Sequence, residues 1–297
     1  MMNFKLLKQL YQINSKSGNE DKIAEFILDF LSKNYTGLIV DYDTVGNIYI
    51  TKGQAEKYPI IAAHLDHVSD YKGKVNIFRR ENIIIGIGEH GKQVNLGADD
   101  KNGIWIALEL LRTEPVLKVV LFPGEEIGCV GSKACDMAFF DNAKFVIQCD
   151  RRNGHDFIYS AGCVTLCDTS FPSAQLKQKY GYVNTTGLMT DVQTLKKRGL
   201  EVACCNLSCG YYNPHSDTEY TDVGELINCL QFVREIVQTV DYTPHKYTAP
   251  TYPSYSYPGY GGCYKGKDVD PQQPEIDWDD WDDSYYANWY SHYYKRY

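Results

Sequence analysis

Two patterns of apolar residues alternate along the first 242 residues of the chain. Apolar side chains three or four positions apart predict helices at Phe4–Gln12, Asp21–Lys33, Lys101–Arg112, Asp191–Arg198 and Asp222–Val240. Short apolar runs predict strands at Leu38–Asp41, Asn47–Thr51, Tyr58–Ala63, Leu117–Phe122, Lys144–Cys149 and Glu201–Leu207, with a hairpin at Lys74–Arg79 and Asn82–Ile87. Because strands that alternate with helices are typical of layered α/β proteins, we expect a three-layer α/β/α sandwich with a mixed, mainly parallel central sheet.

The pattern changes after Tyr242. Residues 243–297 are rich in Tyr, Pro and Gly and then become acidic around Trp278 and Trp281, with no helical or strand period. We therefore divide the chain into a folded body, residues 1–242, and a low-complexity tail, residues 243–297, which we expect to be flexible. The aromatic side chains of this tail could bind the body or a partner protein.

Composition excludes several classes of protein. Hydrophobic residues make up 43% of the 297 residues and charged residues 23%, so the chain is neither fibrous nor disordered throughout. The formal net charge of −8 argues against non-specific binding to nucleic acid or to an anionic membrane surface. No apolar run approaches the roughly 20 residues that a membrane helix needs. We therefore expect neither nucleic acid nor membrane as a partner.

The cysteines and the first residues of the chain indicate the cellular compartment of the protein. Lys5 and Lys8 interrupt the only apolar stretch near the start, which favours an amphipathic helix over a signal peptide. The ten cysteines form no paired CxxC knuckles, so we expect reduced thiols and a cytoplasmic protein. Cys204, Cys205 and Cys209 leave a small metal cluster open as an alternative to structural thiols.

Charged and imidazole side chains stand where the predicted strands end. They are His64, Asp66, Asp99, Asp100, Glu125, Glu126, Asp150 and His215. Each by itself has a structural explanation, because a carboxylate after a strand often caps the next helix. Together they would crowd like charges at one edge of the sheet, which is unfavourable unless cations neutralise them. Carboxylate oxygens mixed with imidazole nitrogens suit zinc, with cobalt or manganese as substitutes, so we predict a metal site.

The order of these residues resembles that of the co-catalytic dizinc exopeptidases, which include peptidase T and the glutamyl-aminopeptidase type. The motifs that carry the resemblance are His64-x-Asp66, Gly97-Ala-Asp99-Asp100-Lys, Glu125-Glu126-Ile-Gly, a post-strand Asp150 and a late His215. The resemblance covers most of residues 1–242. It implies that the folded body is a catalytic domain.

The resemblance also implies a set of metal ligands and an unusual peptide bond. His64 and Asp150 would bind one zinc ion, Glu126 and His215 would bind a second, and Asp99 would bridge both. The peptide bond that follows this bridging aspartate is expected to be cis.

The same resemblance implies the chemistry. Asp66 would orient the imidazole of His64. Glu125 would act as the general base that takes a proton from a water activated by both ions and returns it to the leaving amine. The expected activity is removal of residues from short peptides, most simply by an aminopeptidase. Two alternatives stay open, namely an N-acyl amino acid deacylase or carboxypeptidase-type amidohydrolase, and a non-catalytic, metal-stabilised protein that acts through its tail.

The chain departs from peptidase T in one respect. Only 64 residues separate Asp150 from His215, which leaves no room for an inserted lid or dimerisation domain. We therefore expect a minimal catalytic domain and make no prediction of its oligomeric state. Candidate substrate contacts are Asp191, which could instead cap a helix, and Tyr211, Tyr212 and Asn213, which could instead serve packing.

Overall fold

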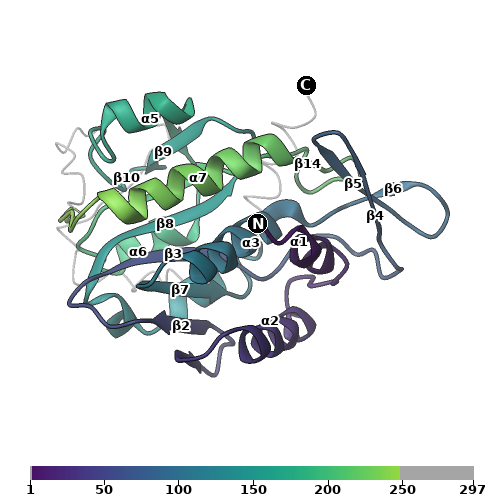
Figure 1. Cartoon of the computed structure of the whole chain (residues 1–297), viewed down its shortest axis with the longest axis horizontal. Helices are drawn as coiled ribbons and strands as arrows, with labels where there is room; N and C mark the ends of the chain where they lie inside the picture. The colour runs from purple at the N-terminus through teal and green to yellow at the C-terminus, as the bar shows by residue number, and fades with distance from the viewer. Residues whose placement is uncertain (1, 248–297) are drawn as a thin grey trace, which may run out of the picture. The chain divides into compact units, whose positions relative to one another are not determined.

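The computed structural model describes residues 2–247, and a nine-stranded mixed sheet forms the centre of the described part (Figure 1). Its four central strands run parallel and are, in spatial order, β7 (Leu117–Phe122), β3 (Tyr58–His64), β8 (Ala143–Arg151) and β12 (Cys204–Ser208). Beyond β7 lie the antiparallel strands β2 (Ile48–Lys52) and β1 (Leu38–Tyr42). Beyond β12 lie β9 (Asp156–Ala161), β10 (Val164–Thr165) and β11 (Val183–Gly187).

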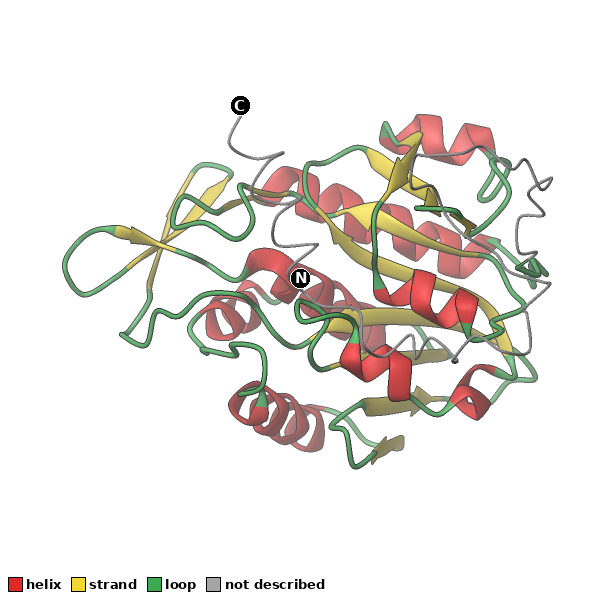
Figure 2. Cartoon of the chain, turned by 180° about the vertical axis from the view of Figure 1, so that it is seen from behind, coloured by secondary structure: helices red, strands yellow, loops and turns green. Residues whose placement is uncertain are grey.

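Helices cover both faces of this sheet. The helices on one side are α1 (Phe4–Tyr11), α2 (Asp21–Asn34), α3 (Ala98–Thr113), α5 (Ala174–Tyr180) and α7 (Val223–Thr239). Those on the other side are α4 (Val130–Ala134), the 3₁₀ helix η1 (Met137–Phe140) and α6 (Asp191–Lys197). Figure 1 faces the side of α7, and Figure 2 faces the opposite side. The predicted α/β sandwich with a mixed sheet is therefore confirmed.

The strand β3 shows why the central strands read as continuous apolar runs. All its residues are buried, because side chains of a strand alternate between the two faces and both faces are covered. Ile61 and Ala63 join the core beneath α3 and α7, whereas Ile60 and Ala62 join the core beneath α6. The two apolar cores thus hold the carboxyl end of β3 in place from both sides.

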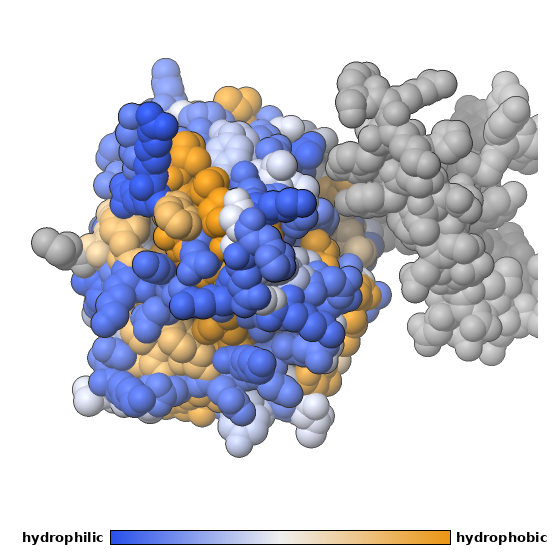
Figure 3. All heavy atoms as spheres, turned by 90° about the vertical axis from the view of Figure 1, so that its right-hand side faces the viewer, coloured by the Kyte–Doolittle hydropathy of each residue, from blue (hydrophilic) through white to orange (hydrophobic). Residues whose placement is uncertain are grey.

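A second, smaller sheet extends from the body on the right of Figure 1. Its antiparallel strands are β13 (Tyr211–Tyr212), β14 (Tyr220–Asp222), β5 (Ile83–Ile87), β4 (Asn76–Arg80) and β6 (Gln93–Val94). Figure 3 looks onto this end and shows apolar surface between hydrophilic residues, and Phe78 and Ile83 are among the exposed apolar side chains of the sheet. The sequence predicts only the β4–β5 hairpin of this sheet.

The longest apolar patterns were predicted best. The strand β7 has the predicted bounds, but α3 begins at Ala98 rather than at Lys101. The short elements α4, α5 and β9–β11 were not predicted, because a run of two to seven residues shows too little periodicity. None of the helices described is long and apolar enough to cross a membrane.

Hydrogen bonds to the folded body are also made by residues after Tyr242. The backbone N–H of Thr243 donates to Lys144, and that of His245 donates to Glu201. The buried ammonium of Lys196 donates to the carbonyl of His245 at 2.6 Å. Segment 243–247 therefore packs on the body, whereas the remainder of the expected tail, 248–297, lies outside the described residues.

Trp105 tests the core beneath α3. This side chain is fully buried, lies 5.6 Å from the ring of Phe4 and donates its indole N–H to the carbonyl of Asn3. We expect Trp105→Ala to lower the free energy of unfolding by about 3–5 kcal/mol, because it leaves a large cavity. Ile39→Ala, at a side chain that is 70% exposed, should change it by less than about 0.5 kcal/mol. Urea denaturation followed by far-UV circular dichroism measures both, and equal losses would contradict the prediction.

Candidate metal centre

The candidate site lies where the parallel strands of the main sheet end, which is where ligands gather in α/β sheets. His64 is the last residue of β3, Glu126 follows β7, and Asp150 lies near the end of β8. Asp99 opens a helix after the predicted hairpin, as expected, but that hairpin belongs to the second sheet, and β13 separates His215 from β12. Asp99 lies in the first turn of α3, after β6, and His215 lies in the connection between β13 and β14. Segments next to the strands of the second sheet therefore carry two of the five predicted ligands.

The five predicted ligands form two groups that share one residue. His64, Asp99 and Asp150 form one group, and Asp99, Glu126 and His215 form the other, with the potential ligand atoms of each group within 4.8 Å of one another. The peptide bond between Asp99 and its successor Asp100 is cis, as the resemblance implies.

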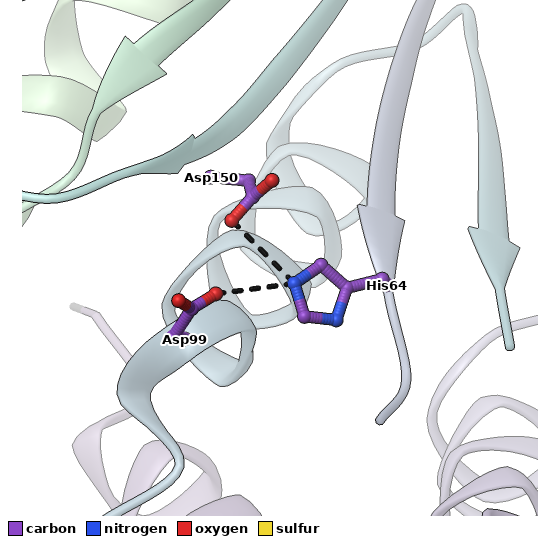
Figure 4. Close-up of side chains that lie close together, drawn as sticks. All are labelled: His64, Asp99 and Asp150. Atoms are coloured by element: carbon purple, nitrogen blue, oxygen red, sulfur yellow. Dashed lines mark hydrogen bonds and ion pairs between the residues drawn. The ribbon is translucent and has the colours of Figure 1, made fainter. Parts of the chain in front are cut away.

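The carboxylate of Asp99 faces both histidines. Its Oδ1 lies 3.1 Å from Nε2 of His64, and its Oδ2 lies 3.2 Å from Nε2 of His215. Oδ1 of Asp150 lies 3.5 Å from Nε2 of His64 (Figure 4). Oε1 of Glu126 lies 2.9 Å from Nε2 of His215. This is the arrangement expected of a carboxylate placed between two cations.

A buried oxygen without a hydrogen bond tests whether these residues fit metal ions. Oε1 of Glu126 is buried and, among the described residues, no donor is oriented to form a hydrogen bond with it, although His215 is close. Leaving a buried acceptor unsatisfied costs about 1–3 kcal/mol, so such an atom needs an explanation. Coordination of a cation provides one. The donors are carboxylate oxygens and imidazole nitrogens, a set that fits divalent zinc.

The electrostatics of the group support the same fit. Burial, together with the charge of Asp99, raises the pKa of Asp150 to about 8. Burial alone would lower the pKa of His215, but the adjacent carboxylates of Asp99 and Glu126 raise it to about 11. Both shifts reflect carboxylates crowded in a buried place, a charge pattern that divalent cations would neutralise.

Asp66 links one histidine to the loop that carries both glutamates. Its Oδ1 lies 3.3 Å from Nδ1 of His64 and accepts the backbone N–H of Glu125 at 2.9 Å. Its Oδ2 accepts the backbone N–H of Glu126 at 3.2 Å and the hydroxyl of Ser17 at 2.7 Å. These contacts are those of a carboxylate that fixes the orientation of an imidazole ligand.

Glu125 stands beside the two groups and belongs to neither. Burial and the charge of Asp150 raise the pKa of its carboxyl well above the ordinary value. The carboxylate lies 3.7 Å from the thiol of Cys129, whose own pKa burial also raises. Glu125 is therefore a proton-holding group next to the candidate metal ligands, and the nearby thiol is a poor nucleophile.

Asp191 is fully buried behind the ligands. It is the first residue of α6 rather than its N-cap, which is Thr190. The hydroxyl of Ser132 donates to its Oδ1 at 2.5 Å, and the amide of Gln148 donates to its Oδ2 at 3.3 Å. Contact between Asp191 and a substrate ammonium stays a prediction.

The three other candidate substrate contacts lie near His215. The hydroxyl of Tyr211 donates to Asp150 at 3.3 Å, so this side chain faces a predicted ligand. The hydroxyl of Tyr212 donates to Glu225, and Asn213 donates to a backbone carbonyl of its own hairpin. Their contact with substrate also stays a prediction.

Two polar residues that the sequence analysis did not single out support the ligands. Gln148 donates to Oδ2 of Asp150 at 3.1 Å and accepts the hydroxyl proton of Thr190 at 2.7 Å. A glutamine inside an apolar strand two residues before a ligand is a signal that sequence reasoning could have used. Glu219 accepts backbone N–H groups around Asp99, and no local pattern marks it. Neither candidate metal group in the described part includes a cysteine.

Comparisons with known proteins identify the fold. No family model matches this chain, and no curated protein matches it in sequence. A tripeptidase from Staphylococcus aureus matches in structure with a TM-score of 0.65 at 16% identity, over 79% of this chain and 96% of that one. Aminopeptidase PepT from Bacillus cereus matches with 0.63 at 15% identity, over 78% and 96%. A TET aminopeptidase from a marine-sediment Thaumarchaeota archaeon matches with 0.61 at 10% identity, over 80% and 97%. The chain therefore has the fold of these peptidases.

The two groups predict how single substitutions change the metal content. Because Asp99 belongs to both groups, Asp99→Ala should abolish binding of both ions, whereas Glu126→Ala should abolish binding of one. Elemental analysis of protein loaded with zinc and dialysed measures this, with two equivalents expected for the wild type. Wild-type metal content in Asp99→Ala would contradict the arrangement.

Proposed function

We propose that the protein is a metal-dependent exopeptidase of the co-catalytic zinc superfamily, most simply an aminopeptidase of short peptides. The observation that carries the proposal is the pair of ligand groups that meet at Asp99. The fold shared with an aminopeptidase and a tripeptidase supports it. Short peptides are accordingly the proposed substrate class.

In this proposal each group holds one divalent ion. His64 and Asp150 would hold the first, Glu126 and His215 the second, and Asp99 both. Zinc fits the mixed oxygen and nitrogen donors, with cobalt or manganese as substitutes. When bound, the two ions supply Lewis acidity that polarises a peptide carbonyl and lowers the pKa of water.

Glu125 is the proposed general base. Its carboxylate takes a proton from the attacking water and delivers it to the leaving amine, so that no covalent enzyme intermediate is needed. Its partial burial suits this task, because burial raises the pKa of the carboxyl and nearby cations lower it toward the working pH.

Asp66 is the proposed positioning residue of this machinery. One carboxylate accepts the backbone N–H groups of Glu125 and Glu126 and lies beside Nδ1 of His64. The general base and two of the metal ligands are thereby fixed relative to one another before substrate binds. This lowers the entropic cost of orienting them during the reaction.

Glu125→Gln separates catalysis from metal binding. We expect this variant to lose about 10²–10⁴-fold in kcat on aminoacyl anilides and on di- and tripeptides, because the proton acceptor is gone. Its zinc content should equal that of the wild type. Glu25→Gln, at an exposed position of α2, should keep wild-type rates. Chelation should abolish wild-type activity and added zinc restore it.

The same assay decides between the remaining alternatives. Cleavage of N-acetylated amino acids in preference to peptides with a free amine would favour the deacylase. Metal binding without turnover of any of these compounds would favour a non-catalytic protein. Full activity in Glu125→Gln, or activity unaffected by the chelator, would refute the proposed mechanism.

A further inference from the structure

The loop before Asp99 and the loop that carries His215 are bonded to each other. The backbone N–H of Asn95 donates to Asp217 at 3.3 Å, and its side-chain amide donates to the carbonyl of Ser216 at 3.2 Å. These contacts join segments more than 100 residues apart in the chain. The two loops therefore hold Asp99 and His215 at a defined separation.

One buried carboxylate lies at the centre of this junction. Glu219 is fully buried, and its Oε2 accepts the backbone N–H groups of Leu96 at 3.0 Å and Ala98 at 3.2 Å. Its Oε1 accepts the backbone N–H of Asp99 at 3.3 Å. Within the described residues no ion pair involves Glu219, and its carboxylate oxygens bind backbone N–H groups. A buried carboxylate that is satisfied in this way fixes the course of the backbone it binds.

The backbone at Asp99 needs such support. Its φ of −78° and ψ of 104° are not helical, although α3 is assigned from Ala98, so regular helix hydrogen bonds do not hold this residue. We propose that Glu219 is a positioning residue that sets the carboxylate of Asp99 against both histidines. Glu219 lies four residues after His215, so a displacement of either loop is passed to the other.

This inference rests on the metal-binding part of the proposed function and not on peptide hydrolysis. Because Asp99 belongs to both ligand groups, the loss of Glu219 weakens the binding of both ions rather than of one. Substitution of a residue that supports a metal ligand in this way costs about 10–100-fold in metal affinity.

Glu219→Gln is the direct test. The amide keeps the size of the side chain but turns one acceptor oxygen into a donor that meets a backbone N–H. We expect the zinc dissociation constants of both sites to rise about 10–100-fold, measured by competition with a chromophoric chelator. The control is Glu109→Gln, since Glu109 is also buried and accepts a backbone N–H, that of Asn3, at 2.9 Å. Glu109 in addition pairs with Arg112 at 2.7 Å and lies near the opposite end of α3 from Asp99. This control should bind zinc as the wild type does.

Two further measurements separate positioning from general stability. The metal-free Glu219→Gln and Glu109→Gln proteins should unfold at similar temperatures, so that weaker zinc binding is specific to Glu219. Asn95→Ala, which removes the contact to Ser216, should weaken zinc binding in the same direction and serves if Glu219→Gln fails to fold.

Unchanged zinc affinity in Glu219→Gln, an equal loss in Glu109→Gln, or weakening of only one site would overturn the inference. So would a wild-type protein that binds no zinc. A wild-type protein that binds two ions but cleaves no peptide would refute the peptidase, while the expected loss in Glu219→Gln would still support the role of Glu219.

Discussion

Repulsion between buried carboxylates is the constraint on which the site depends. Carboxylate oxygens of Asp99, Glu126 and Asp150 lie 2.9–3.5 Å from two imidazoles, in a place where little water screens their charges. Burial and the charge of Asp99 raise the pKa of Asp150, and the neighbouring carboxylates raise that of His215. Stable packing of these residues is therefore coupled to whatever positive charge occupies the site, and the proposed ions supply it.

The architecture provides the rigidity that such a site needs. His64 ends a strand that is buried on both faces, so the apolar cores on both sides fix its position. Asp66 ties the loop after β7 to this strand, and Gln148 ties Asp150 to the start of α6. Glu219, just before β14, accepts the backbone N–H of Asp99. Asn95 donates to the carbonyl of Ser216 beside His215. The candidate ligands come from separate segments and share supports, as preorganisation of the proposed metal centre requires.

The second sheet is also where prediction from sequence is weakest. Its hairpin at β4 and β5 was predicted, but β6, β13 and β14 have only two or three residues each. Strands of this length carry no measurable alternation, and their pairing depends on partners far along the chain. The expectation that these side chains gather at the edge of one sheet was accordingly incomplete. Asp99 and His215 lie next to strands of the second sheet, although all five candidates lie close together.

The sequence by itself determined the long elements, the layered α/β class and the kinds of ligand brought together, because apolar periodicity and residue chemistry are local properties. Tertiary structure alone decided that each oxygen of Asp99 faces a different histidine and that Asp191 lies buried behind Gln148. It also decided that Glu219 holds a backbone 120 residues away. Such contacts arise from the packing of loops against one another, and a single chain read in order contains no periodic signal for them.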